Sequence, residues 1–205
     1  HTDQERRVFV LVKLTFPSFP NPATFFPRFG KRTAPDPAYK PEHTLQPDLF
    51  APSQWHRGSN RFVVIGDAGS GAQGQHDIAR QMGALYAGNP FRSVLVLGDN
   101  VYEHGEPRYF EERIYKPYKD LFEAGVRFFP VLGNHDVNRG FGDQQLNYWG
   151  APPFYSFKLG PKSNEVEFFA IDSTVMLPGA YNAHDDNPFL ARKKAAVQMA
   201  WLDKA

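Results

Sequence analysis

The sequence has no cysteine among its 205 residues, which excludes a disulfide framework, thiol catalysis and a cysteine-ligated zinc finger. It also has little net charge, formally +1, and no lysine and arginine cluster is interleaved with aromatic residues. A nucleic-acid partner is therefore not indicated. No apolar run is long enough to span a bilayer. The remaining composition fits a chain that buries one core and carries an extension.

What the sequence does contain is three short polar motifs, each directly after an apolar run. The runs cover residues 62–65, 94–97 and 128–132, and the motifs are Gly-Asp-Ala-Gly (66–69), Gly-Asp-Asn-Val-Tyr (98–102) and Gly-Asn-His-Asp (133–136). The runs do not alternate with polar residues, which is typical of parallel strands covered on both faces. Their spacing leaves room for crossover helices. Because parallel strands end at one edge of a sheet, we expect the motifs to lie side by side.

These motifs supply the ligand types of a two-metal hydrolytic site. Two cations commonly share one carboxylate, and Asp99, in the middle motif, is the candidate for the shared ligand. Asp67 and Asp99 would repel each other in a partly dry cleft, and a cation would relieve that repulsion. A bound cation also lowers the pKa of its water, which provides a hydroxide that can attack phosphorus.

In this order and context the motifs resemble the first three of five signature blocks of the calcineurin-like metallophosphoesterases. Tyr102 points to the purple acid phosphatase branch, especially its small, tartrate-resistant type. The resemblance covers roughly residues 61–205 and continues through residues 152–157, 168–173 and 198–202. It implies an α/β fold, namely the N-terminal part of a four-layer α/β/β/α sandwich.

The resemblance and the composition together divide the chain. Residues 57–205 are expected to form the metallophosphoesterase domain, incomplete at its C-terminal end. Residues 1–56 are expected to form a proline-rich extension or linker, because neither helical nor strand periodicity persists there.

The apolar pattern predicts further elements within the domain. They are a helix at 75–87, a helical segment at 107–116 that Pro117 breaks and that resumes to about residue 124, a loop through Trp149, and a hairpin of residues 154–159 and 166–171. The inner face of the first helix is predicted to carry Ile78, Met82, Leu85 and Tyr86. Asn187 and Pro188 predict the start of a last helix, with Leu190, Val197 and Trp201 as its apolar positions.

The resemblance also implies a role for each motif residue. Asp67 would bind the first metal, Asp99 would bridge the two metals, and Tyr102 would bind the first metal as a phenolate. Asn134 would bind the second metal, and His135 would lie over the substrate phosphate as a donor or general acid. The implied cofactor is a pair of ions, Fe(III) with Fe(II), zinc or manganese, and tyrosinate-to-iron charge transfer gives the family its purple colour.

Three more residues are candidates for contacting the substrate or supporting the ligands. Asn100 directly follows the shared carboxylate, and His104 lies just beyond Tyr102 in a loop that faces the same edge. Asp136 follows the third motif's ligand pair and is expected to orient His135 or a neighbour.

The sequence departs from the family pattern downstream of these motifs. The last two family blocks supply three histidine ligands, a lone histidine and a Gly-His-x-His, and this sequence contains no Gly-His-x-His. With the four ligands named above, neither metal has a full coordination shell, so we expect weakened binding and a poorly supported second metal. The sequence therefore predicts either a fragment of a longer enzyme or a chain that is inactive as it stands.

The predicted function is hydrolysis of a small phosphate monoester by a metal-bound hydroxide, as in an acid phosphatase. The alternatives are a phosphodiesterase or pyrophosphatase that uses the same metals, or a truncated domain that binds phosphorylated ligands without turnover. Residues 69–74 also match the G-x-G-x-x-G of dinucleotide-binding folds. That interpretation fits poorly, because Asp67 would repel a pyrophosphate and because Asn134 and His135 would have no role. The compartment and the oligomeric state are left open, although the resemblance is compatible with export.

Overall fold

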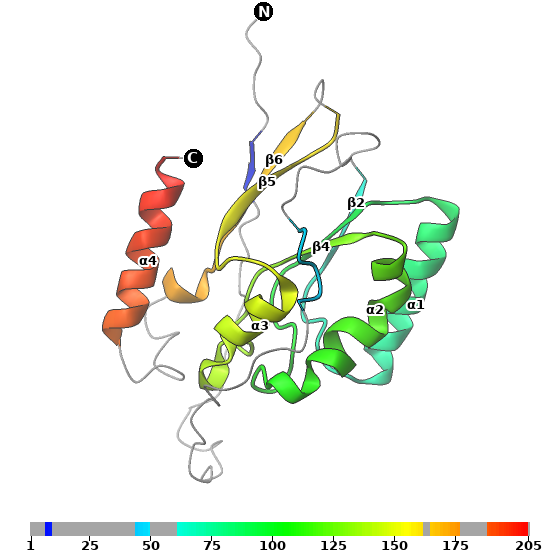
Figure 1. Cartoon of the computed structure of the whole chain (residues 1–205), viewed down its shortest axis with the longest axis horizontal. Coiled ribbons are helices and arrows are strands. Elements are labelled where there is room, and N and C mark those ends of the chain that lie inside the picture. The colour runs from blue at the N-terminus through cyan, green and yellow to red at the C-terminus, as the bar shows by residue number, and fades with distance from the viewer. Residues whose placement is uncertain (1–6, 10–43, 50–60, 162–164, 177–187, 205) are drawn as a thin grey trace, which may run out of the picture.

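The computed structural model describes residues 7–9, 44–49, 61–161, 165–176 and 188–204, which form two three-stranded sheets with helices on both sides (Figure 1). The strands are β1 (Arg7–Phe9), β2 (Phe62–Ile65), β3 (Ser93–Val96), β4 (Arg127–Pro130), β5 (Tyr155–Leu159) and β6 (Val166–Ala170). The α-helices are α1 (Gln73–Gly88), α2 (Lys116–Glu123), α3 (Gly142–Trp149) and α4 (Pro188–Leu202). Shorter helical turns are η3 (Pro107–Tyr109), η4 (Glu111–Tyr115), η5 (Asn138–Gly140) and η7 (Thr174–Met176).

The first sheet is parallel, in the order β2-β3-β4. Every residue of β3 is buried, because α1 and α2 cover one face of the sheet and the second sheet covers the other (Figure 1). This confirms the expected α/β class. On β2, Phe62 and Val64 are 39% and 48% exposed, so the prediction that this strand is covered on both faces is wrong. The reason is position, since β2 is an edge strand.

The second sheet has the order β1-β6-β5, with β5 antiparallel and β1 parallel to β6. The predicted hairpin is confirmed, and residues 162–164 of its turn lie outside the described residues. Trp201 of α4 packs against the sheet with its ring centroid 5.1 Å from that of Phe154 and 6.0 Å from that of Phe169. The layers therefore run from α1 and α2 through the two sheets to α4 (Figure 1).

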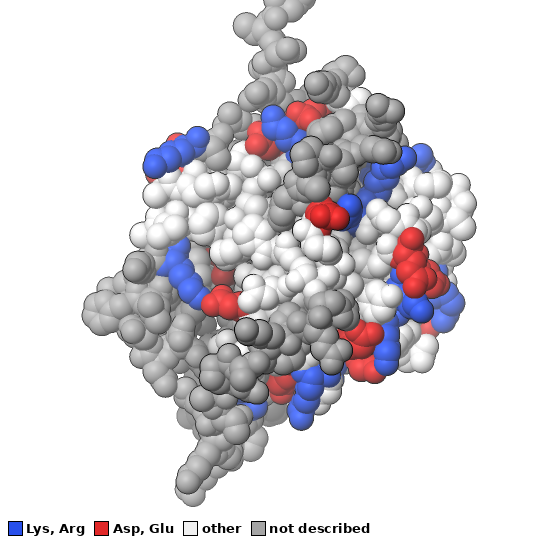
Figure 2. All heavy atoms as spheres, viewed as in Figure 1, with Lys and Arg blue, Asp and Glu red and all other residues white. Residues whose placement is uncertain are grey.

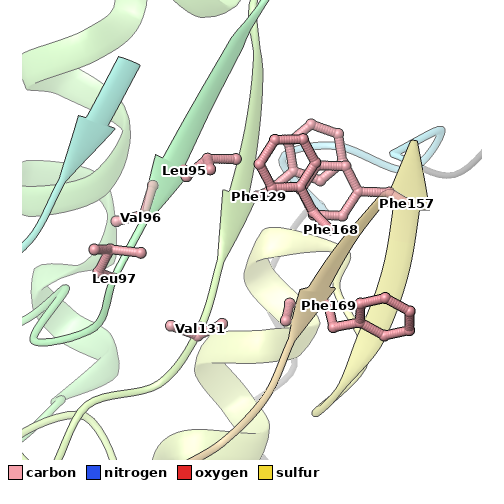
Figure 3. Close-up of a pocket in the computed structure, with 9 residues that line it drawn as sticks. Leu95, Val96, Leu97, Phe129, Val131, Phe157, Phe168 and Phe169 are labelled. Carbon is pink, nitrogen blue, oxygen red and sulfur yellow. The ribbon is translucent and has the colours of Figure 1, made fainter. Parts of the chain in front are cut away.

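Aromatic rings join the two sheets. Phe129 of β4 stacks on Phe157 of β5 with ring centroids 3.8 Å apart, and Phe157 stacks on Phe168 of β6 at 5.2 Å (Figure 3). An apolar cavity of about 20 Å³ lies between the two sheets, lined by these rings and also by Leu95 and Val131. That volume holds about one water molecule and offers it no polar partner. The space between the sheets is therefore hydrophobic core and not a ligand site.

Residues 44–49, assigned by sequence to the extension, contact the domain. Gln46 is 4% exposed, and its side-chain amide both donates to the carbonyl of Phe128 at 2.9 Å and accepts its N–H at 2.8 Å. It thereby satisfies backbone groups of β4 as a neighbouring strand would. Leu49 is 1% exposed. Part of the predicted extension thus contributes to the core, while the division at residue 57 stays a prediction.

Helix α1 buries only part of the face that the sequence predicted: Met82 is buried and Tyr86 packs against the core, as expected, but the other two residues of that face are not buried. Ile78 and Leu85 are 54% and 48% exposed, whereas Gln75, Ala79 and Met82 are buried. The polar side chain of Gln75 can be buried because both ends of its amide are hydrogen-bonded. The bond to Arg113, 38 residues away, thus places a polar residue where apolar periodicity alone indicated none.

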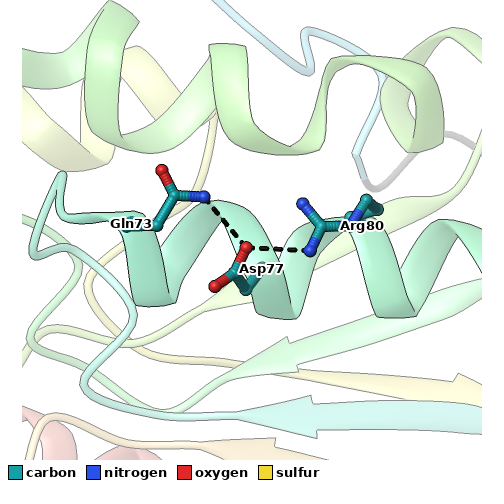
Figure 4. Close-up of polar contacts among 3 residues, drawn as sticks. All are labelled: Gln73, Asp77 and Arg80. Atoms are coloured by element: carbon teal, nitrogen blue, oxygen red, sulfur yellow. Dashed lines mark hydrogen bonds and ion pairs between the residues drawn. The ribbon is translucent and has the colours of Figure 1, made fainter.

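The outer side of α1 carries polar contacts typical of a solvated helix. Asp77 accepts hydrogen bonds from Gln73 and Arg80, both at 2.9 Å, and these two partners lower the pKa of its carboxyl (Figure 4). On the face shown in Figure 2, acidic and basic side chains are scattered among uncharged ones. Within the described ranges, no helix has both the length and the apolarity to cross a membrane.

Two predictions between β3 and β5 are wrong. Pro117 does not break the helical segment, because the π-helical turn η4 leads directly into α2. Pro117 lies in the first turn of α2, where proline is tolerated. The predicted loop before Trp149 contains α3. That helix ends at Gly150, whose φ of 79° is the left-handed conformation common after a helix.

Helix α4 begins at Pro188, as predicted, but its buried contact is polar. Val197 is 52% exposed and Gln198 is 1% exposed, so the predicted apolar face is wrong at Val197. The side chain of Gln198 accepts the N–H of Asp172 at 2.8 Å and donates to the carbonyl of Asp172 at 3.1 Å. The helix is therefore attached to the end of β6 by a pair of hydrogen bonds as well as by Trp201.

Candidate metal centre

The three motif loops are hydrogen-bonded to one another at the carboxyl edge of the parallel sheet. The N–H of Asp67 donates to Gly98 at 3.1 Å, and the N–H of Tyr102 donates to Gly69 at 3.0 Å. The N–H of His135 donates to the Asp99 carboxylate at 3.0 Å. The expectation that the motifs lie side by side is confirmed.

Glycine is required where these loops touch. A Cβ on Gly69 would collide with the carbonyl of Asn100, and a Cβ on Gly133 would collide with the Asp99 carboxylate. The motif glycines therefore serve the close approach of three backbones rather than the binding of a nucleotide.

The two motif aspartates share an unusual backbone conformation. Asp67 and Asp99 have φ of 54° and 53°, in the left-handed region that most residues with a side chain avoid. Aspartate tolerates this region better than most residues. Strained backbone of this kind persists where surrounding contacts hold it, and it clusters at functional sites.

Three oxygen-bearing side chains meet above the sheet edge. The phenol of Tyr102 donates toward Asp67 Oδ1 at 2.6 Å and lies 3.1 Å from Asp99 Oδ2. Asp99 is 7% exposed, whereas Asp67 is exposed. Burial, followed by the bond to Asp67 and the charge of Asp99, strongly raises the pKa of Tyr102. One proton is therefore held between two carboxylates, in the position where a cation would also be stabilised.

The donor set fits one hard cation better than two. Two carboxylates and a phenol provide three oxygen donors, a chemistry suited to a trivalent or small divalent ion. Across the described part of the chain, no three histidine, aspartate or glutamate side chains are close enough to hold a metal by themselves. Asn134 is half-buried between Gly133 and His135, both of which touch Asp99. Its two neighbours in the chain therefore lie against the carboxylate predicted to be shared, and the role of Asn134 as a ligand of the second metal stays a prediction.

Asp136 is fully buried and connects two of the loops. Its carboxylate accepts the N–H groups of Gly133 at 2.8 Å, Val101 at 2.9 Å and Asn100 at 3.1 Å, and the side-chain N–H of Gln145 at 2.9 Å. Burial raises its pKa to about 6, against the lowering effect of these bonds. Asp136 thus orients the backbone next to Asp99, as the sequence allowed, and not the ring of His135.

Asn100 is 2% exposed and belongs to the same network. Its side chain donates to the carbonyl of Val131 at 2.8 Å and to Gln145 Oε1 at 2.9 Å. The predicted alternatives for Asn100 were a substrate contact or support of the ligands, and its hydrogen bonds favour support.

The ring of His135 is held by the second loop. Its Nδ1 lies 2.7 Å from the carbonyl oxygen of Glu103, and its centroid lies 4.5 Å from that of Tyr102. A carbonyl can only accept, so Nδ1 carries the hydrogen and Nε2 is left to interact with a substrate. His104 is half-buried nearby, where burial and then the charge of Arg139 lower its pKa.

Sequence reasoning missed the residues that support the cluster from a distance. They are Gln145 of α3, Gln75 of α1 and Arg113 of η4, whose side chains bond to the motif loops or to each other. No local pattern signals them, because their partners include residues far along the chain: Asn100 lies 45 residues from Gln145, and Arg113 lies 38 residues from Gln75.

Two comparisons with known proteins bear on the family of this chain. Residues 60–202, which contain all three motifs, match the family model of the calcineurin-like phosphoesterases. The chain is also 33% identical over 94 residues to purple acid phosphatase 4 of Arabidopsis thaliana, an alignment that covers 44% of this chain. The same alignment spans only 27% of the length of that relative.

Proposed function

This chain belongs to the calcineurin-like phosphoesterase family, and we propose that it provides the first half of a metal-dependent site that hydrolyses phosphate monoesters, as in an acid phosphatase. The observation that supports this most is the cluster of Tyr102, Asp67 and Asp99, with His135 beside it. A metal-dependent phosphoester hydrolase needs ligands for a cation and a donor to the phosphate at one place, and this edge of the sheet offers both.

We propose that Asp67, Asp99 and Tyr102 hold a first metal ion, Fe(III), with Asp99 shared. Asp99 and Asn134 would hold the second ion, Fe(II), zinc or manganese. Bound metals would supply Lewis acidity and an activated water. An ion held there would take the place of the phenol proton, so metal loading would require Tyr102 to release that proton to solvent.

His135 has the geometry of a phosphate donor in this proposal. Glu103 fixes the ring by accepting from Nδ1–H, so Nε2 is left for the substrate, and in the imidazolium form its N–H can donate to a phosphoryl oxygen or to the leaving group. The backbone N–H of His135 donates to Asp99, which keeps this residue close to the shared carboxylate. The ring also lies against that of Tyr102, with centroids 4.5 Å apart, and its restricted movement favours a single substrate orientation.

The test is metal binding followed by turnover. We expect the purified chain to bind close to one Fe(III), with a visible tyrosinate-to-iron charge-transfer band that Tyr102→Phe removes. Asp99→Asn should weaken binding by at least about 100-fold, since it removes a charged ligand. A chromogenic monoester should be cleaved faster than the matched diester. Tight iron binding with the band intact in Tyr102→Phe would exclude this tyrosine as a ligand.

A second candidate function is phosphate binding without turnover. It is favoured by the donor set, which supplies three oxygens for one ion and only Asn134 and the shared Asp99 for another. In that case the chain would bind one metal and inorganic phosphate, and neither ester would be cleaved. Preference for the diester would instead favour a phosphodiesterase with the same metals.

A further inference from the structure

Arg113 contacts the backbone of the residue that supplies the phenol. Its Nη1 donates to the carbonyl oxygen of Tyr102, and its side chain is half-buried. A guanidinium gives a charge-assisted bond, which is stronger than a neutral one. The carbonyl of Tyr102 is therefore fixed by a cation that is not itself in the oxygen cluster.

Two further contacts restrict the guanidinium. Its Cζ lies 3.9 Å from the ring centroid of Tyr109, a cation–π contact. Gly71, with φ of 68°, also lies close to this side chain, since a Cβ there would come within 2.9 Å of Arg113 Nε. The first motif loop therefore continues into a glycine that leaves room for this side chain.

Gln75 links the backbones of the same two segments. Its Oε1 accepts the N–H of Gly71 at 2.7 Å, and its Nε2 donates to the carbonyl of Arg113 at 2.6 Å. Because Gln75 is 6% exposed, these bonds are shielded from water. Arg113 and Gln75 together connect the end of the first motif loop, through η4, to Tyr102 of the second loop.

The backbone around Arg113 is itself unusual. Arg113 is the middle residue of the π-helical turn η4, which directly precedes α2. A π turn carries an extra residue and changes the direction of the side chains within it, and such turns are frequent at functional sites. This local geometry supports a specific role for Arg113 over that of a solvated surface arginine.

We propose that Arg113 is a positioning residue for Tyr102, holding the second loop so that the phenol oxygen stays between Asp67 and Asp99. The consequence for metal binding rests on the proposed function, since it requires Tyr102 to be a ligand. The positioning itself is a property of the metal-free chain. Arg113 touches neither the metal nor the substrate in this scheme.

The experiment compares four variants of the full chain. Arg113→Gln removes the charge, Arg113→Lys keeps a charge and a donor, and Gly71→Ala displaces the guanidinium without changing it. The matched control is Arg108→Gln, because Arg108 lies 4.6 Å from the ring centroid of the same Tyr109 but is 70% exposed and pairs with Glu106. Circular dichroism selects the variants that fold.

Two readouts separate positioning from general stability. In the metal-free chain, hydrogen exchange should accelerate at the Tyr102 amide, which is bonded to Gly69, and not at the Val131 amide, which is bonded to Val96. In iron titrations, Arg113→Gln should weaken Fe(III) binding about 10- to 100-fold and shift the charge-transfer band. Arg113→Lys should recover part of both effects, and Arg108→Gln should show neither.

The outcomes distinguish this inference from the function on which it rests. Unchanged exchange at Tyr102 in both Arg113→Gln and Gly71→Ala overturns the positioning role. Faster exchange at Tyr102 with an unaltered iron affinity and band overturns its consequence for the metal. If the unmodified chain shows no charge-transfer band, the proposed role of Tyr102 as ligand fails, and the exchange data alone still decide whether Arg113 positions it.

Discussion

Two buried aspartates follow strands of different sheets, and each is paired with a glutamine from a helix. Asp136 comes after β4 and is bonded to Gln145 of α3, and Asp172 comes after β6 and is bonded to Gln198 of α4. Both carboxyls are shielded, with 0% and 6% of the residue exposed, and burial raises the pKa of each. The residue types are the same, but the bonds are arranged differently.

The carboxylate of Asp136 joins separate segments, whereas that of Asp172 binds its own turn. Asp136 accepts backbone N–H groups from the second and third motif loops. Asp172 accepts the N–H of Thr174 at 2.9 Å and its hydroxyl, and Gln198 binds the backbone of Asp172 instead of its carboxylate. One pair therefore organises the candidate metal site and the other attaches a helix. A buried carboxylate joins separate segments when the surrounding N–H groups come from different loops, and it stabilises a single turn when they come from its own.

The largest effect is expected for Asp136→Ala. It leaves three buried backbone N–H groups and the side-chain N–H of Gln145 without this acceptor, so we expect a loss of roughly 3 kcal/mol or more in the free energy of unfolding. Iron binding should weaken as well, because the loop of Asp99 is released. Urea unfolding monitored by fluorescence measures the first effect, and a metal titration measures the second. A loss below about 1 kcal/mol would mean that the loops do not depend on this carboxylate.

An intermediate effect is expected at the two glutamines, and it should separate the two regions. Gln145→Met and Gln198→Met should each cost about 1–3 kcal/mol, since each removes two buried hydrogen bonds. Only Gln145→Met should weaken iron binding. Hydrogen exchange should accelerate in α4 for Gln198→Met alone. Equal losses of iron affinity in both variants would contradict the division between an organising pair and an anchoring pair.

A smaller, pH-dependent effect is expected for Asp172→Asn. The folded pKa of Asp172 is raised above 3.8, chiefly by burial, so the folded state holds this proton more tightly than the unfolded state does. The Asp172 carboxyl therefore contributes most to the stability of the fold below pH 3.8, and this contribution declines as the pH rises through the folded pKa. The asparagine variant keeps an acceptor for Thr174 and lacks this decline. Its stability relative to the unmodified chain should therefore increase between about pH 3 and about pH 7, as urea unfolding across that range would show.

The smallest effect is expected for Asp77→Ala on the outer side of α1. Its bonds to Gln73 and Arg80 are exposed to solvent, and such contacts contribute little (Figure 4). We expect no measurable change in the urea midpoint or in iron binding. A clear destabilisation here would show that surface contacts rival the buried aspartates in this fold.

Much of the fold could be predicted from the sequence because its signals are local. The apolar runs before Gly66, Gly98 and Gly133 indicated three parallel strands, and the hairpin was indicated by the alternation of its first strand. Asn187 and Pro188 marked the start of α4. Each of these signals depends on neighbouring residues, which is why periodicity and turn chemistry reveal it.

The misses have a common cause. Helix α1 buries Gln75 and exposes Ile78, and α4 buries Gln198 and exposes Val197. In both helices a glutamine binds distant polar groups, which overrides the apolar periodicity. The site was predicted in the same uneven way: the motif residues were found, while Gln145 and Arg113 were not.

The sequence by itself determined the chemistry that is available, because the placement of Asp67, Asp99, Tyr102, Asn134 and His135 directly after strands decides which side chains reach the sheet edge. Only the tertiary structure decided how these groups are held. Asp136 bonds to Val101 across 35 residues and Gln46 to Phe128 across 82. Such pairings form because a buried polar group must find a partner wherever the folded chain brings one.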